Sequence, residues 1–196
     1  MSSSKERVRY EDNLPPWRQL IRGAQERERR GTWSRWLQLA SIAHDGTPRV
    51  RTLVFRGWSG PAQLDLLSDA RTEKVTELQQ TPYTELCWLL PKARCQFRLR
   101  GRASLSSDDD DTRRQDHWRN LSASGKALWA WPDPGTLLSN DALWPISLAN
   151  TIATPIHFVL IRVDISQVDL LNLSVRPHRR KRWRQQNGWI TEDLNP

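Results

Sequence analysis

Apolar and polar positions alternate in short runs through the middle of the chain, as they do in strands with one buried face. Such runs cover residues 36–43, 49–58, 63–68, 84–91 and 95–105. Turn residues separate the runs, and the pairs Asp45-Gly46 and Gly60-Pro61 favour tight reversals between neighbouring strands. The pattern predicts a small antiparallel barrel or sandwich.

Helical spacing of apolar positions marks segments that flank or interrupt these runs. One predicted helix covers residues 17–30 after Pro15-Pro16, another covers 70–80, and more helix is expected within 106–131. Residues 131–145 are expected to form a Pro-rich loop, and 157–173 a final pair of strands. The fold class expected is mainly β with flanking helices, an α+β protein. We expect one domain over 1–196, with 1–14 as a polar tail.

The aspartate run from Asp108 to Asp111 is acidic enough to suggest a metal site. Four adjacent carboxylates cannot converge on one ion from a regular helix, however. Ser107 and the aspartates are instead well placed to cap a helix start and to complement its dipole. The sequence therefore predicts a solvated helix terminus there, and no metal site.

The chain has 196 residues and a formal net charge of +8. Much of the excess lies in two basic segments, 22–35 and 176–186, which fit solvated surface as well as a nucleic-acid site. No apolar stretch reaches the length of a membrane helix. No signal peptide precedes Cys87 and Cys95, so we expect a cytoplasmic protein with reduced thiols.

The run "RVRTLVFRGW" at 49–58 carries three arginines, at positions 49, 51 and 56. An arginine in a half-buried strand costs desolvation energy, so each calls for an anionic partner. Arg51 has two candidate partners. One is a phosphate group, which its planar guanidinium can contact with two donors, and the other is Asp65 or Asp69 on a neighbouring strand.

Three motifs follow in order: "RTLVFRG", "LLSDARTEKVTEL" and "TELCWLLPKARCQFRLRGRA". Together they resemble the FMN-binding split barrel of the pyridoxamine 5'-phosphate oxidase-related proteins. The resemblance extends over nearly the whole chain. It implies an FMN-binding split β-barrel, FMN as cofactor, and a homodimer with FMN at the subunit junction.

The resemblance also assigns residues to the cofactor. Its phosphate would lie against Arg51, Ser68 and Lys74, with Thr72 as a further hydroxyl near the start of the predicted helix, where free N–H groups favour an anion. The flavin ring would lie over the backbone of Thr52, Leu53 and Val54. Gln96 would contact the pyrimidine edge, because an amide both donates and accepts there. An exposed strand glutamine is the alternative for Gln96. In the C-terminal basic run, Arg182 is the residue assigned to the flavin or its phosphate.

Two residues correspond to substrate-binding positions of the oxidases, Arg56 and Ser124. A surface arginine at a strand end is the alternative for Arg56. Further along, the oxidases bind the substrate phosphate with an arginine and a tyrosine, and these positions fall on Asn120 and Asp116 here. A shift of one or two residues in the alignment brings Trp118 and Arg119 to this place instead. The resemblance therefore does not imply a vitamin B6 substrate. No side chain identifies itself as an acid or base, so the catalytic residues are unknown.

Three functions are consistent with these residues. The first is an FMN-dependent oxidoreductase with an unknown small-molecule substrate, and its chemistry would be two-electron transfer at the flavin. The second is a flavin- or haem-binding protein without turnover. The third, and the one least favoured by the motifs, is a nucleic-acid-binding protein that uses the 176–186 run. Trp129, Trp131 and Trp144 can cover a flavin or build core and interface.

Overall fold

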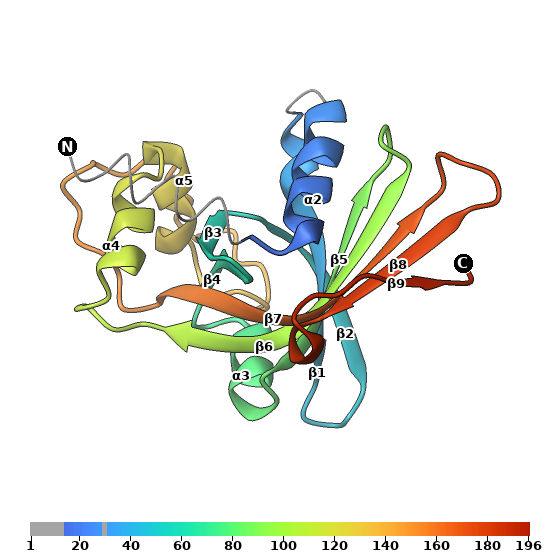
Figure 1. Cartoon of the computed structure of the whole chain (residues 1–196). Coiled ribbons are helices and arrows are strands. Elements are labelled where there is room, and N and C mark those ends of the chain that lie inside the picture. Colours follow the sequence, from blue (N-terminus) through green and yellow to red (C-terminus); the bar gives the residue numbers. More distant parts are fainter. Residues whose placement is uncertain (1–13, 29–30) are drawn as a thin grey trace.

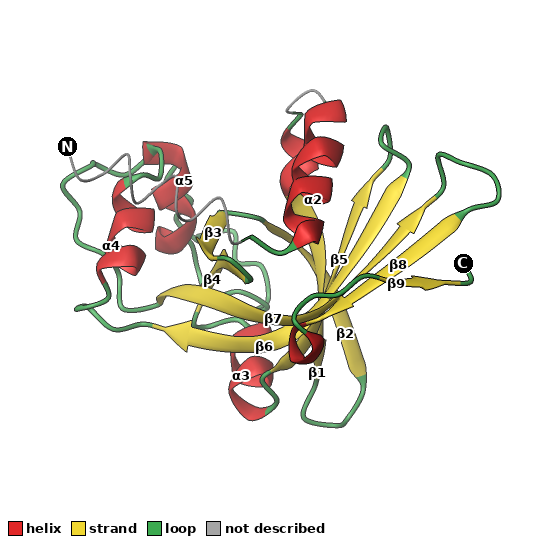
Figure 2. Ribbon diagram, viewed as in Figure 1, coloured by secondary structure: helices red, strands yellow, loops and turns green. Residues whose placement is uncertain are grey.

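We describe a computed structural model of the chain over residues 14–28 and 31–196. A curled antiparallel sheet forms its centre, with α2 and α3 at opposite ends and α4 and α5 on one side (Figure 1, Figure 2). The strands in chain order are β1 (Trp36–Ile42), β2 (Pro48–Val54), β3 (Gly57–Gly60), β4 (Gln63–Asp69), β5 (Tyr83–Leu90), β6 (Cys95–Ser106), β7 (Phe158–Asn172), β8 (Arg179–Arg184) and β9 (Glu192–Leu194). The fold class predicted from sequence is confirmed.

The helices are short, and they precede β1 or connect successive strands along the chain. They are α2 (Pro16–Arg27), α3 (Glu73–Gln80), α4 (Thr112–Arg119) and α5 (Ala123–Ala127), with 3-10 turns η1 (Thr32–Arg35), η2 (Leu128–Ala130) and η3 (Gln185–Asn187). As predicted, an aspartate caps α4, because the Asp111 carboxylate accepts hydrogen bonds from the N–H groups of Arg113 and Arg114. The predicted tail at 1–14 falls outside the described residues except for Leu14.

The strand order along the sheet is β2-β1-β5-β6-β7-β4-β3, and β8 and β9 extend it from β7. The main core fills the inner face, where α2 contributes Trp17 and Ile21 and α3 contributes Leu78. A second, smaller core lies on the opposite side of β4 and β7, under α4, and contains Trp118, Trp129 and Phe158. On the side away from the main core, part of the sheet has no covering helix (Figure 1). This uncovered outer face consists of β2, β1, β5, β8 and the parts of β6 and β7 next to them.

Three segments differ from the sequence-based prediction. The run 49–58 forms two strands, β2 and β3, rather than one. The chain changes partner between them: the Phe55 N–H donates to the carbonyl of Arg35, just before β1, and the Arg56 N–H donates to the carbonyl of Asp65 on β4. Gly57 has a φ of 143°, which permits the change of direction. Residues 157–173 are one strand, β7, rather than two. Within β7, Ser166 lies at a bulge opposite Arg100 and Gly101 of β6, so the strand bends there without ending.

The third difference is the C-terminal basic run. Six of its residues form β8, which pairs with β7 on one side and β9 on the other. From sequence, the run fits solvated surface or a nucleic-acid site, because a block of like charges has no partner within itself. The partners are carboxylates on neighbouring strands, which no local pattern in the run itself could indicate.

Gly101 on β6, opposite the bulge in β7, permits a close approach between the two strands. A Cβ at this position would overlap the carbonyl oxygen of Asp164 on β7. We expect Gly101→Ala to lower the free energy of unfolding by about 1 to 3 kcal/mol, because the backbone must shift to admit the methyl group. Denaturant unfolding monitored by tryptophan fluorescence measures this loss.

Gly23→Ala is the matched control for this substitution. Gly23 lies inside α2, and a Cβ there meets nothing within 4 Å. Alanine should therefore stabilise the chain by about 0.5 to 1 kcal/mol through its helix preference. Equal effects of the two substitutions would contradict the proposed clash at the bulge.

Candidate functional site

Four residues assigned to the cofactor phosphate come together at the start of α3. Ser68 ends the buried part of β4, and its hydroxyl accepts a hydrogen bond from the Lys74 ammonium at 3.3 Å. The Ser68 hydroxyl also lies 3.3 Å from the Thr72 hydroxyl. Thr72 is the N-cap residue of α3 and its side chain makes no capping bond to the helix. The first turn of α3 therefore offers N–H groups, two hydroxyls and an ammonium in one place.

Arg51 approaches the same place from β2. Its guanidinium donates to the Glu77 carboxylate on α3 at 2.7 Å and to the Ser41 hydroxyl. The alternative that Arg51 pairs with Asp65 or Asp69 is wrong. Asp65 pairs with Arg113, and Asp69 pairs with Arg71. Glu77 lies one helical turn beyond Lys74 on α3 and was not identified from sequence.

The electrostatics of this cluster favour an added anion. Burial lowers the pKa of Lys74, and the nearby Arg51 cation lowers it further. Arg51 and Lys74 therefore share a half-buried space, in which the Asp69 and Glu77 carboxylates act on Lys74 in the opposite sense. A phosphate group there would add negative charge beside both cations and would raise the pKa of the lysine again.

Thr52, Leu53 and Val54 complete the same strand. The sheet begins with β2, which pairs with β1 alone, so its other edge offers free backbone groups to a ligand. The side chains alternate. Leu53 lies opposite Leu37 on the inner face, while Thr52 and Val54 lie opposite Gln38 and Trp36 on the outer face. The prediction that these residues offer backbone groups fits an edge strand.

Gln96 lies on the other face of the sheet from Arg51. Arg51 is opposite Leu39, which is opposite the buried Leu86, so its side chain belongs to the inner face. Gln96 lies between the buried Cys95 and Phe97 and therefore points outward. Because register is continuous from β2 to β6, one chain cannot present both side chains to a single flavin.

Arg182 also lies on the outer face. It donates to both carboxylate oxygens of Asp169, at 2.8 and 2.9 Å. Arg98 and Arg180 donate to the same carboxylate at 3.0 and 2.7 Å. Burial would raise the pKa of Asp169, but these hydrogen bonds, first those from Arg182 and Arg180, outweigh burial and hold the pKa far below its usual value.

The register shows how this cluster relates to Gln96. Gln96 lies opposite Leu171, which lies opposite Arg180, so these three form one row across β6, β7 and β8. Arg182 lies in the next row, with Asp169. The assignment of Arg182 to the flavin or its phosphate stays a prediction. The register puts Arg180, rather than Arg182, in the same row as Gln96.

Arg56 is half-buried and its Nε atom has no hydrogen-bond partner. Burial lowers its pKa, and the neighbouring Arg35 cation lowers it further. Within the described residues no carboxylate forms an ion pair with either arginine. The alternative that Arg56 is an exposed surface arginine is therefore wrong, because its side chain is half-buried. Ser124 is exposed on α5, and its hydroxyl lies 3.1 Å from that of Ser122.

Asp65 is fully buried and holds side chains of α4. His117 lies 2.9 Å from its Oδ2 atom, and Arg113 donates to the same atom. Burial alone would raise the pKa of Asp65, but the hydrogen bonds from His117 and Arg113 outweigh it and lower the pKa. The cluster fastens α4 to β4, and it explains why Asp65 is not available to Arg51.

The three tryptophans considered for the flavin divide between two roles. Trp129 is buried in the second core, with its ring edge-on to Phe158 at 4.8 Å. Trp131 and Trp144 contact one another at 5.4 Å in the loop before β7. Trp129 is thus a core residue, and the other two belong to the loop.

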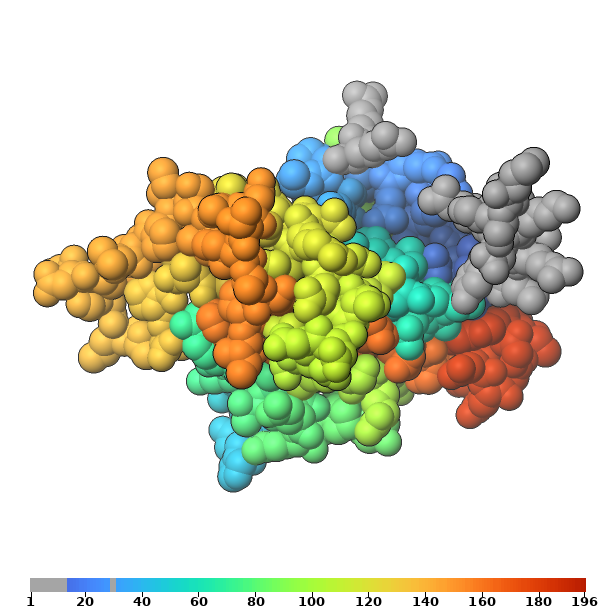
Figure 3. All heavy atoms as spheres, turned by 90° about the vertical axis from the view of Figure 1, so that its left-hand side faces the viewer, coloured from blue at the N-terminus to red at the C-terminus, as the bar shows by residue number. Residues whose placement is uncertain are grey.

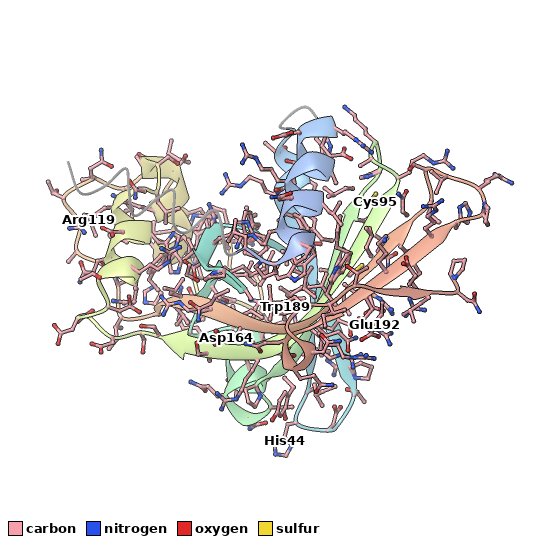
Figure 4. The ribbon with its side chains drawn as sticks, in the orientation of Figure 1. His44, Cys95, Arg119, Asp164, Trp189 and Glu192 are labelled. Carbon is pink, nitrogen blue, oxygen red and sulfur yellow. The ribbon has the colours of Figure 1, made fainter. Side chains whose placement is uncertain are left out.

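Other surface features limit what the chain can do. Arg180 and Arg182 of the basic run form ion pairs with Asp169, and Arg184 pairs with Glu192 on the edge strand β9 (Figure 4). Less charge is therefore left for a nucleic acid than the sequence suggests. None of the helices described here is both long and apolar enough to cross a membrane.

Comparison with known proteins identifies the relatives of this chain. Residues 14–107 match the family model described as pyridoxamine 5'-phosphate oxidase, FMN-binding domain. A crystal structure of a pyridoxamine 5'-phosphate oxidase-related, FMN-binding protein from Nostoc punctiforme is 36% identical, with a TM-score of 0.84 over 93% of this chain and 99% of that one.

Two more distant relatives agree. Pyridoxine/pyridoxamine 5'-phosphate oxidase 2 of Arabidopsis thaliana is 28% identical over 94% of this chain and 98% of that protein. The structure of PhzG from Burkholderia lata, solved in complex with tetrahydrophenazine-1-carboxylic acid, is 20% identical with a TM-score of 0.77, over 95% of this chain and 96% of that one. The second likeness shows the fold alone.

The residues present fit FMN. The α3 cluster has two cations together with N–H and hydroxyl donors for a phosphate dianion, and β2 has a free backbone edge beside it. Gln96 offers an amide on an uncovered face. Together with the relatives, these features show that the chain belongs to the pyridoxamine 5'-phosphate oxidase-related family of FMN-binding split-barrel proteins, and that FMN is its cofactor.

Proposed function

We propose that this protein is an FMN-dependent oxidoreductase that acts on a small anionic molecule, and that two copies of the chain build each flavin site. The observation that carries the two-copy arrangement is the register, which puts Arg51 and Gln96 on opposite faces of one sheet. A second copy whose outer face meets the β2 edge of the first would bring its own Gln96 to the flavin bound by Arg51. The protein would work in the cytoplasm.

Each group in the proposed site has a separate task. FMN, when bound, supplies two-electron transfer. Arg51, Lys74 and Ser68 bind its phosphate, and these charge-assisted hydrogen bonds fix the position of the cofactor along β2. The Gln96 amide of the second copy donates to the pyrimidine edge and stabilises negative charge that builds up there on reduction.

Arg56 supports an anionic substrate. A half-buried guanidinium with an unpartnered Nε, next to a second arginine, is costly unless an anion completes it. The family supports this role, since Arg56 corresponds to a substrate-phosphate position, and the Arabidopsis relative is called a pyridoxine/pyridoxamine 5'-phosphate oxidase. We propose a phosphate- or carboxylate-bearing substrate.

We expect Arg56→Met to raise the KM for an anionic substrate by about 10- to 100-fold, because one charge-assisted contact is lost. FMN content should stay unchanged, since Arg56 is not assigned to the cofactor. Steady-state kinetics with pyridoxine 5'-phosphate and pyridoxamine 5'-phosphate, and with uncharged pyridoxine for comparison, measure the effect. An equal KM for phosphorylated and uncharged forms in the wild type would contradict the anionic substrate.

A mixing experiment tests the two-copy site. Arg51→Ala and Gln96→Ala should each weaken FMN binding when purified alone. Refolding the two variants together gives mixed dimers in which one site carries both substitutions and the other carries neither. About a quarter of all sites should then bind FMN with wild-type affinity, if copies associate at random. Recovery of no sites would contradict the sharing of residues between copies.

Turnover is tested separately from binding. The purified protein should be yellow, and anaerobic addition of pyridoxamine 5'-phosphate or NAD(P)H should bleach the flavin absorbance. A yellow protein that none of these donors reduces would favour a flavin carrier over an oxidoreductase. A colourless protein that does not take up FMN in a titration would contradict the proposed function itself.

A further inference from the structure

A cavity lies between α2 and the segment that joins β2 to β3. Its volume is about 450 Å³, which is within the range of small-molecule sites. Figure 3 shows this side of the molecule, where α2 in blue and the teal segment around β3 lie next to one another. The lining residues are Leu14, Arg18, Gln19, Arg22, Gln25, Phe55 and Trp58. None of these residues belongs to the α3 cluster, which lies at the other end of the sheet (Figure 1).

Arg18 is the central polar group of this α2 cavity. Its guanidinium lies over the Trp58 ring, 3.7 Å from the ring centroid, and its Nη1 atom donates to the carbonyls of Gly60 and Pro61 at 2.9 and 2.7 Å. These contacts fix the guanidinium plane against β3. The Nε and Nη2 atoms make no hydrogen bond to any residue within 14–28 and 31–196. That edge of the guanidinium is therefore available to a group with two acceptor oxygens.

The charge of the α2 cavity favours an anion. Its lining contains two arginines and no carboxylate. Burial lowers the pKa of Arg18 to about 10, and no ion pair with a described carboxylate opposes this effect. Arg22 lies exposed at the rim and pairs at 3.3 Å with Glu26, which does not line the cavity. A half-buried cation without a counter-ion is costly, and a bound anion would offset that cost.

The apolar part of the lining is mainly aromatic. Phe55 is buried in the main core, and its ring lies 5.2 Å from the Trp58 ring. Trp17 lies 5.7 Å from Trp58, is fully buried, and its Nε1 atom has no hydrogen-bond partner among the described residues. A forked cation beside flat apolar walls fits a planar aromatic body that carries an anionic group.

We propose that the α2 cavity is a second ligand site, separate from the flavin site, and that it binds a small aromatic carboxylate or phosphate. The anionic group would accept hydrogen bonds from Arg18, Arg22 would attract it at the rim, and the ring would pack against Phe55. This binding needs neither electron transfer nor a residue of the α3 cluster. It can therefore be tested apart from the proposed function.

Calorimetric titration of the full chain, saturated with FMN, tests the proposal. At least one of two probes, naphthoate and naphthyl phosphate, should bind once per chain, and uncharged naphthalenemethanol should bind about 10-fold more weakly. Arg18→Met should weaken binding of the anionic probe by about 10-fold or more. Arg56→Met should leave it unchanged. A loss in Arg56→Met instead would place the anion at the proposed substrate site and would overturn the second site.

Arg18 also bonds to the chain after β3, so a second pair of variants leaves those bonds in place. Arg22→Glu reverses a charge at the rim and should weaken binding of the anionic probe by about 5-fold. Arg27→Glu is the matched control, because Arg27 lies on the same helix, does not line the cavity and gives the same change in net charge. Equal losses in the two variants would indicate general attraction and would overturn the proposal.

Crystals of the FMN-loaded protein with bromonaphthoate locate the probe directly. The anomalous signal of bromine should lie between α2 and Phe55. Bromine found only beside the flavin or Arg56 would contradict the assigned site. So would the failure of both anionic probes to bind the wild type with a Kd below about 1 mM.

Discussion

Replacing Arg51 by alanine should weaken FMN binding by about 2 to 3 kcal/mol, on the order of 100-fold in Kd, because a charge-assisted contact to the phosphate is lost. The same guanidinium also neutralises the buried Glu77 carboxylate. Arg51→Ala could therefore lose affinity through damage to α3, and unfolding of the apo protein must be measured beside FMN titration.

Lys74→Met avoids this ambiguity. Lys74 bonds only to the Ser68 hydroxyl among the described side chains, so its removal leaves no carboxylate without a partner. Its loss should lower the affinity for FMN by a similar factor while apo stability holds or rises, because a desolvated cation is removed.

Arg49→Ala is the matched control on β2. Arg49 lies two residues from Arg51 on the same strand and face, and it pairs loosely with Asp45 at 3.8 Å near the surface. FMN affinity should be unchanged in this variant. If Arg49→Ala and Arg51→Ala weaken binding equally, the effect is general electrostatic attraction and the assigned phosphate site is wrong.

Replacing Asp169 by alanine should cost about 3 to 5 kcal/mol of unfolding free energy, since removing one partner from a buried ion cluster leaves uncompensated charge. The Asp169 residue is 3% exposed and three arginines converge on it from β6 and β8. Without the carboxylate, these cations repel one another across the β7–β8 pair. Thermal and denaturant unfolding measure the loss.

Glu85→Ala is the comparison for Asp169→Ala. Glu85 contacts Arg98 and Arg100 on the same face, but at 30% side-chain exposure water screens the pair. Its removal should cost about 0 to 1 kcal/mol. Similar losses in the two variants would show that the outer-face network is not centred on the buried carboxylate.

The pH dependence of stability follows from the same residue. The pKa of Asp169 is lowered in the folded chain from its ordinary value of 3.8, so its stabilising contribution is complete above that value and is lost as pH falls below it. The wild type should therefore lose stability steeply below about pH 4. Asp169→Asn, already destabilised at neutral pH, should show a shallower loss there in an acid titration of unfolding.

The local pattern of the sequence was enough for the short strands, for the helix that begins near Thr72 and for the capped start of α4. Alternation with period two and turn residues are local signals, and a strand with one buried face must show them. The motifs around Arg51, Lys74 and Gln96 likewise identified the family and its cofactor. The particular assignment of each of these residues to FMN stays a prediction.

Only the tertiary structure showed which residues from distant segments become partners, because strand pairing brings them together. Nothing local to the run at 176–186 shows that two of its arginines pair with Asp169 on another strand, and nothing local to Arg51 points to Glu77 on α3. The placement of Arg51 and Gln96 on opposite faces depends on register across four strands, which is set by packing of the whole core. A sequence records which side chains a strand carries, but the face that each one shares with distant residues exists only once the strands have paired.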